Sequence, residues 1–570
     1  MARTVAIGIQ DFADIVEKNY FYIDKTGFIK EWWESGDSVT LIARPRRFGK
    51  TLNISMLNRF FSCEYEGQGK VFEGLEIWED EKYRSLQGTY PVISLSFANV
   101  KGTDYESALF QMKEIIKKQF EKYSFVRDSA VLSESEKIYY DRVRMDMNQM
   151  EAAMALHQLS DFLCRYYGKK VIILLDEYDT PMQEAYVRGY WDELVAFTRS
   201  MFNSTFKTNP YMERAVMTGI TRVSKESVFS DLNNLKVVTT TSDEYATAFG
   251  FTQEEVFSVM EEYQLGREKE QVKSWYDGFT FGQHTDIYNP WSILNFLDTG
   301  ILDTYWANTS SNSLIDKVIR EGNTGIKQQF EELMQGKHLW TPIDEQIVYN
   351  RLDETPQAVW SLLLASGYLK VCFREQEYMI KDGAEPQYEL DLTNYEVKRM
   401  FEKMVRGWFA QTQTEYNGFI RALLQGDIEE MNDYMNEVAE YTFSNFDTGI
   451  RPSKTEPERF YHGFVLGLMV DLRDKYIITS NGESGFGRCD VMLEPRNPQE
   501  YDAIIMEFKV LNSRRESSLE DCVQSALAQI EEKQYEAQLV ERGIPKERIR
   551  RYGFAFKGKE VLIGQGQNND

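Results

Sequence analysis

SVTLIARPRRFGKTLNISMLNRF (Ser38–Phe60) is the stretch that decides how the N-terminal part of the chain folds. Its apolar run Val39–Ala43 predicts a buried strand, and a helix is expected to open at Gly49. Consecutive backbone N–H groups at a helix N-terminus bind anions, and phosphates above all. The loop therefore predicts a phosphate-binding loop, in which Lys50 reaches the β- and γ-phosphates of a nucleotide and the Thr51 hydroxyl binds Mg²⁺.

One position departs from the usual pattern of such loops. G-x-x-x-x-G-K-[ST] places glycine five residues before Gly49, whereas this chain has Arg44. The alternative interpretation is a basic turn between a core strand and a core helix. We favour the nucleotide site, with Arg46 and Arg47 as further residues that contact the bound cofactor.

Length and composition indicate a folded protein of several domains. The chain has 570 residues, of which 42% are hydrophobic and 14% aromatic, so three or four cores are expected. The net charge of −25 argues against a general nucleic-acid coat protein. A polyanionic partner would have to bind at a local basic patch.

The cysteines and histidines predict neither a disulfide framework nor a zinc site. The five cysteines are scattered without a C-x-x-C pair, and there are only four histidines. This pattern is typical of a reducing cytoplasm, where we expect the protein to be located. The N-terminus lacks the apolar run of a signal peptide, and no apolar run is long enough to cross a bilayer, so no membrane partner is expected.

A second strand carries acids at its end. Lys170–Glu177 (KVIILLDE) is apolar throughout, which is typical of a strand buried on both faces of a parallel sheet. It ends in Asp176 and Glu177, the form of a Walker B strand, where Asp176 holds the nucleotide's Mg²⁺ and Glu177 polarises the attacking water. The alternative interpretation is a solvated strand end. A GKT loop and an hhhhDE strand in one chain favour an NTPase.

Strands that alternate with helices over long connections predict a right-handed α/β sheet. A further strand at Arg214–Met217 runs into Thr218 and Arg222. Thr218 is expected to sense the γ-phosphate and Arg222 to stabilise its charge, although both could be ordinary loop residues. We expect a P-loop ATPase core over residues 1–245, a helical lid over 246–327 and a helical middle region over 328–450.

The C-terminal part, residues 451–570, contains a second chemical constellation. The strands Arg488–Leu493 and Ala503–Val510 are expected to form a hairpin, which places Asp490 opposite Glu507. Facing carboxylates are unfavourable unless a cation lies between them. Lys509 shares the face of Glu507. Two carboxylates that hold Mg²⁺ and a lysine that orients water are the parts of a metal-dependent phosphodiesterase.

Further residues are assigned to this constellation. Glu458 could supply another oxygen ligand, and Gln529, on a helix predicted over Leu519–Val540, could point back at the site. In Glu541–Glu560 seven basic residues accompany three acids, which predicts a basic patch for a phosphate backbone. The alternative interpretation is an exposed hairpin with an ordinary Glu–Lys ion pair.

The chain resembles the AAA-ATPase-like bacterial family, which commonly carries a C-terminal PD-(D/E)XK nuclease-like domain. The strings that carry the resemblance are Tyr22-Ile-Asp-Lys-Thr26, Arg44-Pro-Arg-Arg-Phe-Gly-Lys-Thr51, Leu175-Asp-Glu-Tyr-Asp179, Gly250-Phe-Thr252 and Trp275-Tyr-Asp-Gly-Phe279. The resemblance implies that arginine at position 44, in place of glycine, is usual in this family. It also implies the nucleotide roles of Lys50, Thr51, Asp176 and Glu177.

For the C-terminal domain the resemblance implies a nuclease core of Asp490, Glu507 and Lys509, with Glu458 and Gln529 as accessory residues. Two functions remain open. In the first, ATP binding and hydrolysis gate an Mg²⁺-dependent nuclease that acts on nucleic acid, on DNA more than RNA. In the second, a nucleotide-dependent regulatory or sensor module binds nucleic acid or protein without cutting. A homo-oligomer is left open.

Overall fold

The structure is a computed structural model, and its contacts divide the chain into two compact units, Met1–Met400 and Phe401–Asp570. It describes residues 3–222, 228–229, 231–306, 313–321, 324–344, 352, 355–375, 385–408, 416–442, 472, 475–484, 487–511, 516–557 and 560–566. The predicted division at residues 245, 327 and 450 is finer than these two units and remains a prediction.

The N-terminal unit is built on a five-stranded parallel sheet in the order β2-β3-β4-β1-β5. Its strands are β1 (Val39–Ala43), β2 (Val92–Ser96), β3 (Val171–Asp176), β4 (Met212–Gly219) and β5 (Leu235–Val238). Every residue of β1 and β3 is buried, as expected for apolar strands covered on both faces. The predicted parallel α/β sheet is confirmed.

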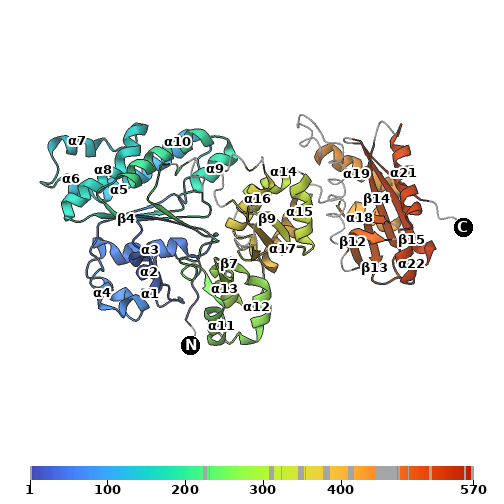
Figure 1. Ribbon diagram of the computed structural model, residues 1–570, viewed down its shortest axis with the longest axis horizontal. Coiled ribbons are helices and arrows are strands. Elements are labelled where there is room, and N and C mark those ends of the chain that lie inside the picture. Colours follow the sequence, from blue (N-terminus) through green and yellow to red (C-terminus); the bar gives the residue numbers. More distant parts are fainter. Residues whose placement is uncertain are drawn as a thin grey trace. The chain divides into compact units, whose positions relative to one another are not determined.

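Helices cover both faces of this sheet (Figure 1): α5, α8 and α10 lie over one face, and α2 and α3 over the other. The helices of this part are α1 (Phe12–Glu17), α2 (Gly27–Ser35), α3 (Lys50–Phe61), α4 (Glu81–Arg84), α5 (Tyr105–Lys122), α6 (Ser124–Arg127), α7 (Glu134–Arg142), α8 (Gln149–Tyr167), α9 (Thr180–Arg188) and α10 (Trp191–Phe202). Because β4 lies between β1 and β3, the carboxyl ends of these three strands meet at one edge, where ligands bind in open α/β sheets.

The region predicted as a helical lid contains α11 (Gln253–Glu262), α12 (Lys269–Tyr276) and α13 (Pro290–Thr299). Between them lies a small sheet, β6-β8-β7, formed by β6 (Phe251–Thr252), β7 (Phe279–Phe281) and β8 (His284–Tyr288). The predicted helices are present, and the sheet is an addition. Aromatic residues of the lid, Tyr276, Tyr288 and Phe296, pack with Phe21 into one apolar cluster.

The next region contains the helices α14 (Ser313–Glu321), α15 (Thr324–Met334), α16 (Pro356–Ala365) and α17 (Tyr395–Trp408). Its helical character is as expected. It also holds an antiparallel sheet, β10-β11-β9, formed by β9 (Leu339–Pro342), β10 (Leu369–Arg374) and β11 (Gln387–Leu392). The strands are short, and β9 pairs with β11 across α16 and β10, which is why the sequence pattern did not reveal them.

The C-terminal unit is a mixed sheet in the order β12-β13-β14-β15-β16. Its strands are β12 (Tyr476–Ser484), β13 (Gly487–Pro495), β14 (Ala503–Val510), β15 (Ile549–Lys557) and β16 (Glu560–Gln565). Only the β14–β15 pair is parallel, and the other three pairs are antiparallel. This is the predicted C-terminal α/β domain.

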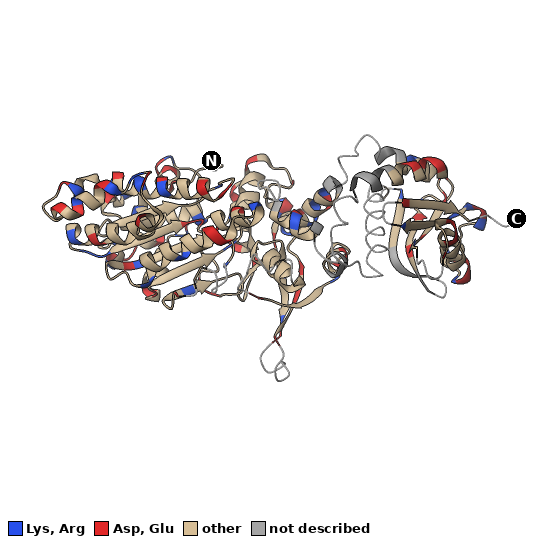
Figure 2. Ribbon diagram, turned by 90° about the horizontal axis from the view of Figure 1, so that it is seen from above, with Lys and Arg blue, Asp and Glu red and all other residues tan. Residues whose placement is uncertain are grey.

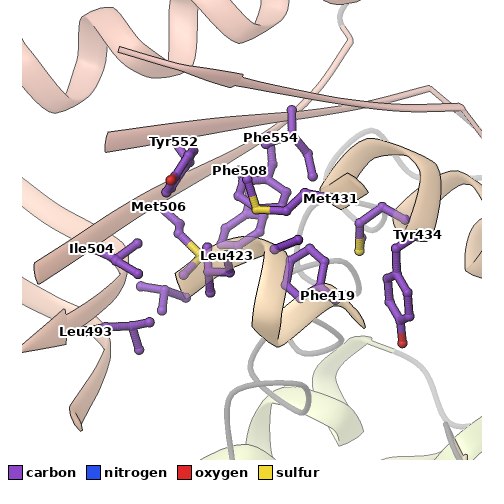
Figure 3. Close-up of a cluster of buried hydrophobic side chains, with 14 of the residues drawn as sticks. Phe419, Leu423, Met431, Tyr434, Leu493, Ile504, Met506, Phe508, Tyr552 and Phe554 are labelled. Atoms are coloured by element: carbon purple, nitrogen blue, oxygen red, sulfur yellow. The ribbon is translucent and has the colours of Figure 1, made fainter. Parts of the chain in front are cut away.

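Helices cover both faces of the second sheet. On one side α21 (Leu519–Glu532) packs Cys522, Val523 and Ile530 into a core that α22 (Ala537–Glu541) joins through Leu539. On the other side, α18 (Tyr416–Gln425) and α19 (Ile428–Thr442) pack Phe419, Leu423 and Met431 against strand residues such as Met506, Phe508 and Phe554 (Figure 3). Helices that precede residue 450 are thus part of the same core as β14.

Helix α19 also covers the edge of this sheet. Asn432 Nδ2 donates to Ile563 O at 3.0 Å, while Ile563 N donates to Asn432 Oδ1 at 2.8 Å. Asn436, one turn later, makes the same pair of bonds with Val561, at 2.8 and 2.9 Å. Two side-chain amides therefore pair with the outer edge of β16, which would otherwise expose unpaired backbone groups.

Candidate nucleotide and nuclease sites

The phosphate-binding loop connects β1 to α3 in a compact turn. Gly49 precedes α3 with φ = +79°, a left-handed conformation that glycine adopts without strain, and Arg47 also has positive φ, at +65°. Lys50 is buried, and its Nζ donates to the carbonyl oxygens of Arg44 at 2.9 Å and Pro45 at 2.7 Å. Burial lowers the pKa of Lys50, which the nearby carboxylates of Glu177, Asp176 and Asp179 oppose.

Asp176 lies between two hydroxyl groups at the end of β3. Thr51 Oγ1 donates to Asp176 Oδ2 at 2.6 Å, and Thr218, at the end of β4, donates to Asp176 Oδ1. The Asp176 side chain is 2% exposed, and burial raises its pKa. The structure therefore brings together the two residues predicted to bind Mg²⁺, Thr51 and Asp176. An oxygen-only group of this kind fits a hard divalent cation.

Glu177 directly follows the Walker B strand in an unusual backbone conformation. Its φ is +51°, which is uncommon for a residue other than glycine and is typical of functional sites. Glu177 N lies 3.4 Å from Thr218 Oγ1, and its Oε2 accepts from Thr180 Oγ1 at 3.2 Å. Glu177 therefore follows Asp176 at the end of β3, and its carboxylate bonds the first residue of α9.

Asp179 is a site residue that sequence reasoning quoted within a motif but did not assign. It is 1% exposed, and its Oδ2 accepts from Ile220 N at 3.0 Å, Thr221 N at 2.9 Å and Thr221 Oγ1 at 3.0 Å. Burial raises its pKa, while the two N–H donors oppose this. Asp179 thus ties the turn after β3 to the loop after β4. Asp179 could have been assigned from the sequence, because it is the third acid of the motif Leu175-Asp-Glu-Tyr-Asp179.

Arg44, which replaces glycine in the loop pattern, has a structural role. Its side chain is fully buried, donates to the carbonyl oxygens of Thr239 and of Glu244 (3.0 Å), and lies 4.3 Å above the ring of Phe281. Burial lowers its pKa to about 9. The arginine therefore connects the phosphate-binding loop to the segment after β5 and to the lid strand β7.

The other predicted basic contacts lie around the loop. Arg46 Nη2 donates to Gln183 Oε1 of α9 at 3.2 Å. The exposed Arg47 places its guanidinium 4.2 Å above the ring of Trp291 in α13. Arg222 lines a cavity together with Thr240, Asp344 and Ser361, among others. Contact of these three arginines with nucleotide stays a prediction.

In the C-terminal unit the predicted hairpin is present. Val491 pairs with Met506 in the antiparallel β13–β14 ladder, and Asp490 and Glu507 are the next residues along these two strands, just beyond the last ladder pair. Asp490 Oδ2 accepts from Phe508 N at 2.9 Å, while Glu507 is 3% exposed on the central strand. Two carboxylates thus come close together on neighbouring strands, a donor set that fits Mg²⁺.

Gln529 connects the remaining residues of this constellation. From α21 its Nε2 donates to Glu507 Oε1, and its Oε1 accepts from Lys509 Nζ at 2.6 Å. Its Nε2 also lies 3.2 Å from the hydroxyl of Tyr535, a residue that the sequence did not single out. The structure therefore assembles Glu507, Lys509 and Gln529 as predicted. Glu458, the other accessory residue, lies outside the described residues.

The stretch Glu541–Glu560 was predicted to be a basic patch, and the structure corrects this interpretation. Six of its seven basic residues are described, and each forms an ion pair with a carboxylate: Arg542–Glu494, Lys546–Glu536, Arg548–Asp502, Arg550–Asp502, Arg551–Glu531 and Lys557–Glu560. Figure 2 shows basic and acidic segments side by side in this unit. In all of these pairs except Lys557–Glu560 the acid comes from another segment, so the local charge count overstated the positive field.

Comparison with known proteins finds one matching family model in the N-terminal part of the chain and another in the C-terminal part. Residues 6–229 match the family model of a predicted AAA-ATPase, and residues 456–566 match that of the PD-(D/E)XK nuclease superfamily. The resemblance inferred from the motifs is thereby confirmed. Among the described residues, no helix is long and apolar enough to cross a membrane.

Individual relatives are distant. A protein of Azotobacter chroococcum mcd 1, described as "Uncharacterized protein in vnfD 5'region", is 25% identical over 403 residues, which are 70% of this chain and 68% of that protein. The structure of the Aeropyrum pernix ORC2 protein (ADPNP-ADP complexes) covers 67% of this chain and 92% of its own at 9% identity. Its TM-score of 0.24 is too low to support further comparison.

Proposed function

We propose that the N-terminal unit binds and hydrolyses ATP with Mg²⁺, and that this gates an Mg²⁺-dependent nuclease in the C-terminal unit. The substrate is a nucleic acid, DNA more than RNA. The observation that carries the proposal is the assembly of two separate carboxylate constellations in one chain. Asp176 is held by Thr51 and Thr218 at the phosphate-binding loop, and in the C-terminal unit Asp490 bonds the backbone of β14, the strand that carries Glu507 and Lys509.

At the nucleotide site each residue has a chemical task. Lys50 is buried at the loop, and phosphate oxygens would replace the backbone carbonyls that its Nζ now contacts. Thr51 and Asp176 would hold Mg²⁺, which neutralises charge on the phosphates. Glu177, at the same edge of the sheet, would orient the attacking water. Arg46 and Arg47 would contribute positive charge beside the loop.

At the nuclease site the two carboxylates would hold Mg²⁺, which activates water and stabilises charge on the phosphodiester. Lys509 would stabilise the charged transition state. Gln529 bonds both Glu507 and Lys509, so it positions the two side chains. Glu458 is proposed as an accessory oxygen ligand.

The alternative function is a nucleotide-dependent module whose C-terminal domain binds nucleic acid or protein without cleaving it. The observation that favours it is the ion pairing of the Glu541–Glu560 stretch. Paired arginines release fewer counterions on contact with phosphates, so they contribute less to binding a nucleic-acid backbone.

The decisive experiment incubates the full-length protein with Mg²⁺, with and without ATP, and with a mixture of DNA and RNA. We expect cleavage whose rate changes with ATP. Asp490→Asn should abolish cleavage and the Mn²⁺ binding of the C-terminal site, measured by calorimetry without nucleotide, whereas Lys509→Ala should keep that metal binding and lose cleavage. Glu500→Gln, an exposed acid in the β13–β14 turn, is the matched control.

The outcomes separate the two functions. Metal binding with cleavage supports the nuclease. Metal binding without cleavage under any nucleotide condition supports the regulatory module. If Asp490→Asn binds as much metal as the parent protein, Asp490 is not a metal ligand. Both assignments of the C-terminal site are then wrong.

A further inference from the structure

The small sheet β10-β11-β9 places three metal-binding side chain types together on one face. Leu390 of β11 pairs with Leu339 of β9, and this register brings Asp391 beside His338, the residue before β9. The turn that ends α15 at Gly336 (φ = +84°) delivers His338 to this position. Lys370 of β10 pairs with Asp391 on its other side.

A β-bulge adds the third side chain. The β10–β11 register shifts between Val371, which pairs with Leu390, and Phe373, which pairs with Glu389. Cys372 is therefore the extra residue on β10. Bulges re-aim a side chain relative to the regular alternation of a strand, and they are frequent at functional sites. Here the bulge exposes the Cys372 thiol on the face that carries Asp391.

The three donors lie close enough to share an ion. An imidazole nitrogen of His338, Sγ of Cys372 and a carboxylate oxygen of Asp391 all lie within 4.8 Å of one another. Ligands of a tetrahedral Zn²⁺ are about 2.0–2.3 Å from the ion, so small side-chain movements would bring these donors into coordination. Asp391 is already oriented, because its Oδ1 accepts from Leu392 N at 2.7 Å.

The donor chemistry selects the class of metal. A thiolate and an imidazole are preferred ligands of Zn²⁺ and poor ligands of Mg²⁺ and Ca²⁺, which take oxygen. Among the described residues, the charged groups that act on the Cys372 thiol are the ammonium group of Lys370 and the carboxylates of Asp391 and Glu389, a balance that suits a cation. The site is therefore chemically distinct from the oxygen-only groups at Asp176 and at Asp490.

We propose that His338, Cys372 and Asp391 bind one Zn²⁺, with water in the fourth position. The ion joins a residue of β10, a residue of β11 and the residue that leads into β9, so it fastens the three strands of this sheet to each other. The ligands are separated by 33 and 18 residues in the sequence, and no short Cys or His motif marks them. This is why the sequence predicted no zinc site.

The test uses the full-length protein, stripped of metal with a chelator and titrated with Co²⁺. Cobalt replaces zinc in such sites, and a Co²⁺–thiolate bond gives a charge-transfer absorption band in the near ultraviolet. We expect the band to reach its full height at one thiolate-bound Co²⁺ per chain, and Zn²⁺ to displace that ion. Cys372→Ser should remove the band, while His338→Ala and Asp391→Asn should weaken binding by at least about tenfold.

Two variants serve as controls. Cys164→Ser, a half-buried cysteine of α8, should keep the band, and so should Asp490→Asn, which removes a ligand of the proposed Mg²⁺ site. A band that Cys372→Ser leaves unchanged would overturn the proposal. So would a titration without a band, or one that needs a large excess of Co²⁺ over protein.

Discussion

At the residue scale, the nucleotide site depends on the buried side chain of Lys50 and on Glu177, whose backbone has a positive φ. We expect Lys50→Ala to abolish tight ATP binding, because no other charge would reach the β- and γ-phosphates from the helix start. Glu177→Gln should keep binding but slow turnover by about a hundredfold or more, since an amide cannot accept the proton of water. Calorimetry and phosphate release measure the two effects. The exposed Lys70→Ala should match the parent, and ATP binding by Lys50→Ala as tight as the parent's would refute the loop assignment.

Arg44 leads to a second prediction at this scale. Arg44→Gly restores the usual loop pattern but deletes a fully buried side chain that bonds three backbone carbonyl groups and packs on Phe281. We therefore expect no gain in ATP affinity and a loss of about 2–5 kcal/mol in the free energy of unfolding, measured by denaturant titration.

The matched control lies three residues further in the same loop. Arg47 is exposed and has φ = +65°, a conformation that glycine adopts more easily, so Arg47→Gly should leave stability nearly unchanged. Tighter ATP binding by Arg44→Gly would mean that the arginine handicaps the loop instead of supporting it.

At the element scale, the lid contains two acids, Asp277 and Asp286, whose carboxyl groups form a hydrogen bond with each other. Burial, together with a hydrogen bond to the Asp286 carboxylate, raises the pKa of Asp277 to about 6. The same bond, with Lys273 at 3.1 Å, lowers the pKa of Asp286. A carboxyl group whose pKa is raised by folding stabilises the fold below its unfolded pKa, near 3.9, and loses this contribution as the pH rises through about 6.

Asp277→Asn should remove that pH dependence, because an amide donates to Asp286 at any pH. We expect the melting temperature of the variant, relative to the parent, to rise between about pH 4 and about pH 6 and to stay level above that. Asp298→Asn, at an exposed position of α13, is the control and should follow the parent. A constant difference between Asp277→Asn and parent over this range would show that Asp277 does not titrate there.

The elements that could be predicted were those with strong local patterns. Thr51 and Asp176 were assigned to one site because Thr51 lies at the start of the helix that follows one apolar strand, and Asp176 ends another. Asp490 and Glu507 were paired by counting across a hairpin. The strands β9 to β11 were missed because they are short and their partners are distant in sequence. The packing of α18 on β14 and the ion pairs of Arg548 and Arg550 with Asp502 depend on tertiary contacts, which local charge and periodicity do not encode.

At the scale of the whole molecule, the question is how a nucleotide could influence residues beyond the N-terminal unit. Trp306 Nε1 donates to Arg46 O of the phosphate-binding loop at 3.0 Å, and Trp306 N donates to Glu396 Oε1 at 2.6 Å. Glu396 also accepts from Ser292 of α13 at 2.8 Å. It lies in the first turn of α17, the helix that spans the division between the two units. Two hydrogen bonds thus connect the loop to the start of α17.

If this connection transmits nucleotide binding, it should respond to the loss of a single hydrogen bond. Trp306→Phe keeps an aromatic ring but removes the donor to Arg46 O, so ATP affinity should change little. In the parent, a non-hydrolysable ATP analogue should alter the hydrogen exchange of the amides of α17, Tyr395–Trp408. Trp306→Phe should abolish that response, while the exposed Trp340→Phe should retain it. If nucleotide binding acts on α17 through Trp306, removal of its hydrogen bond to the loop must change the response. An unchanged response in Trp306→Phe would therefore exclude this route. The gating would then have to pass through other contacts of the lid.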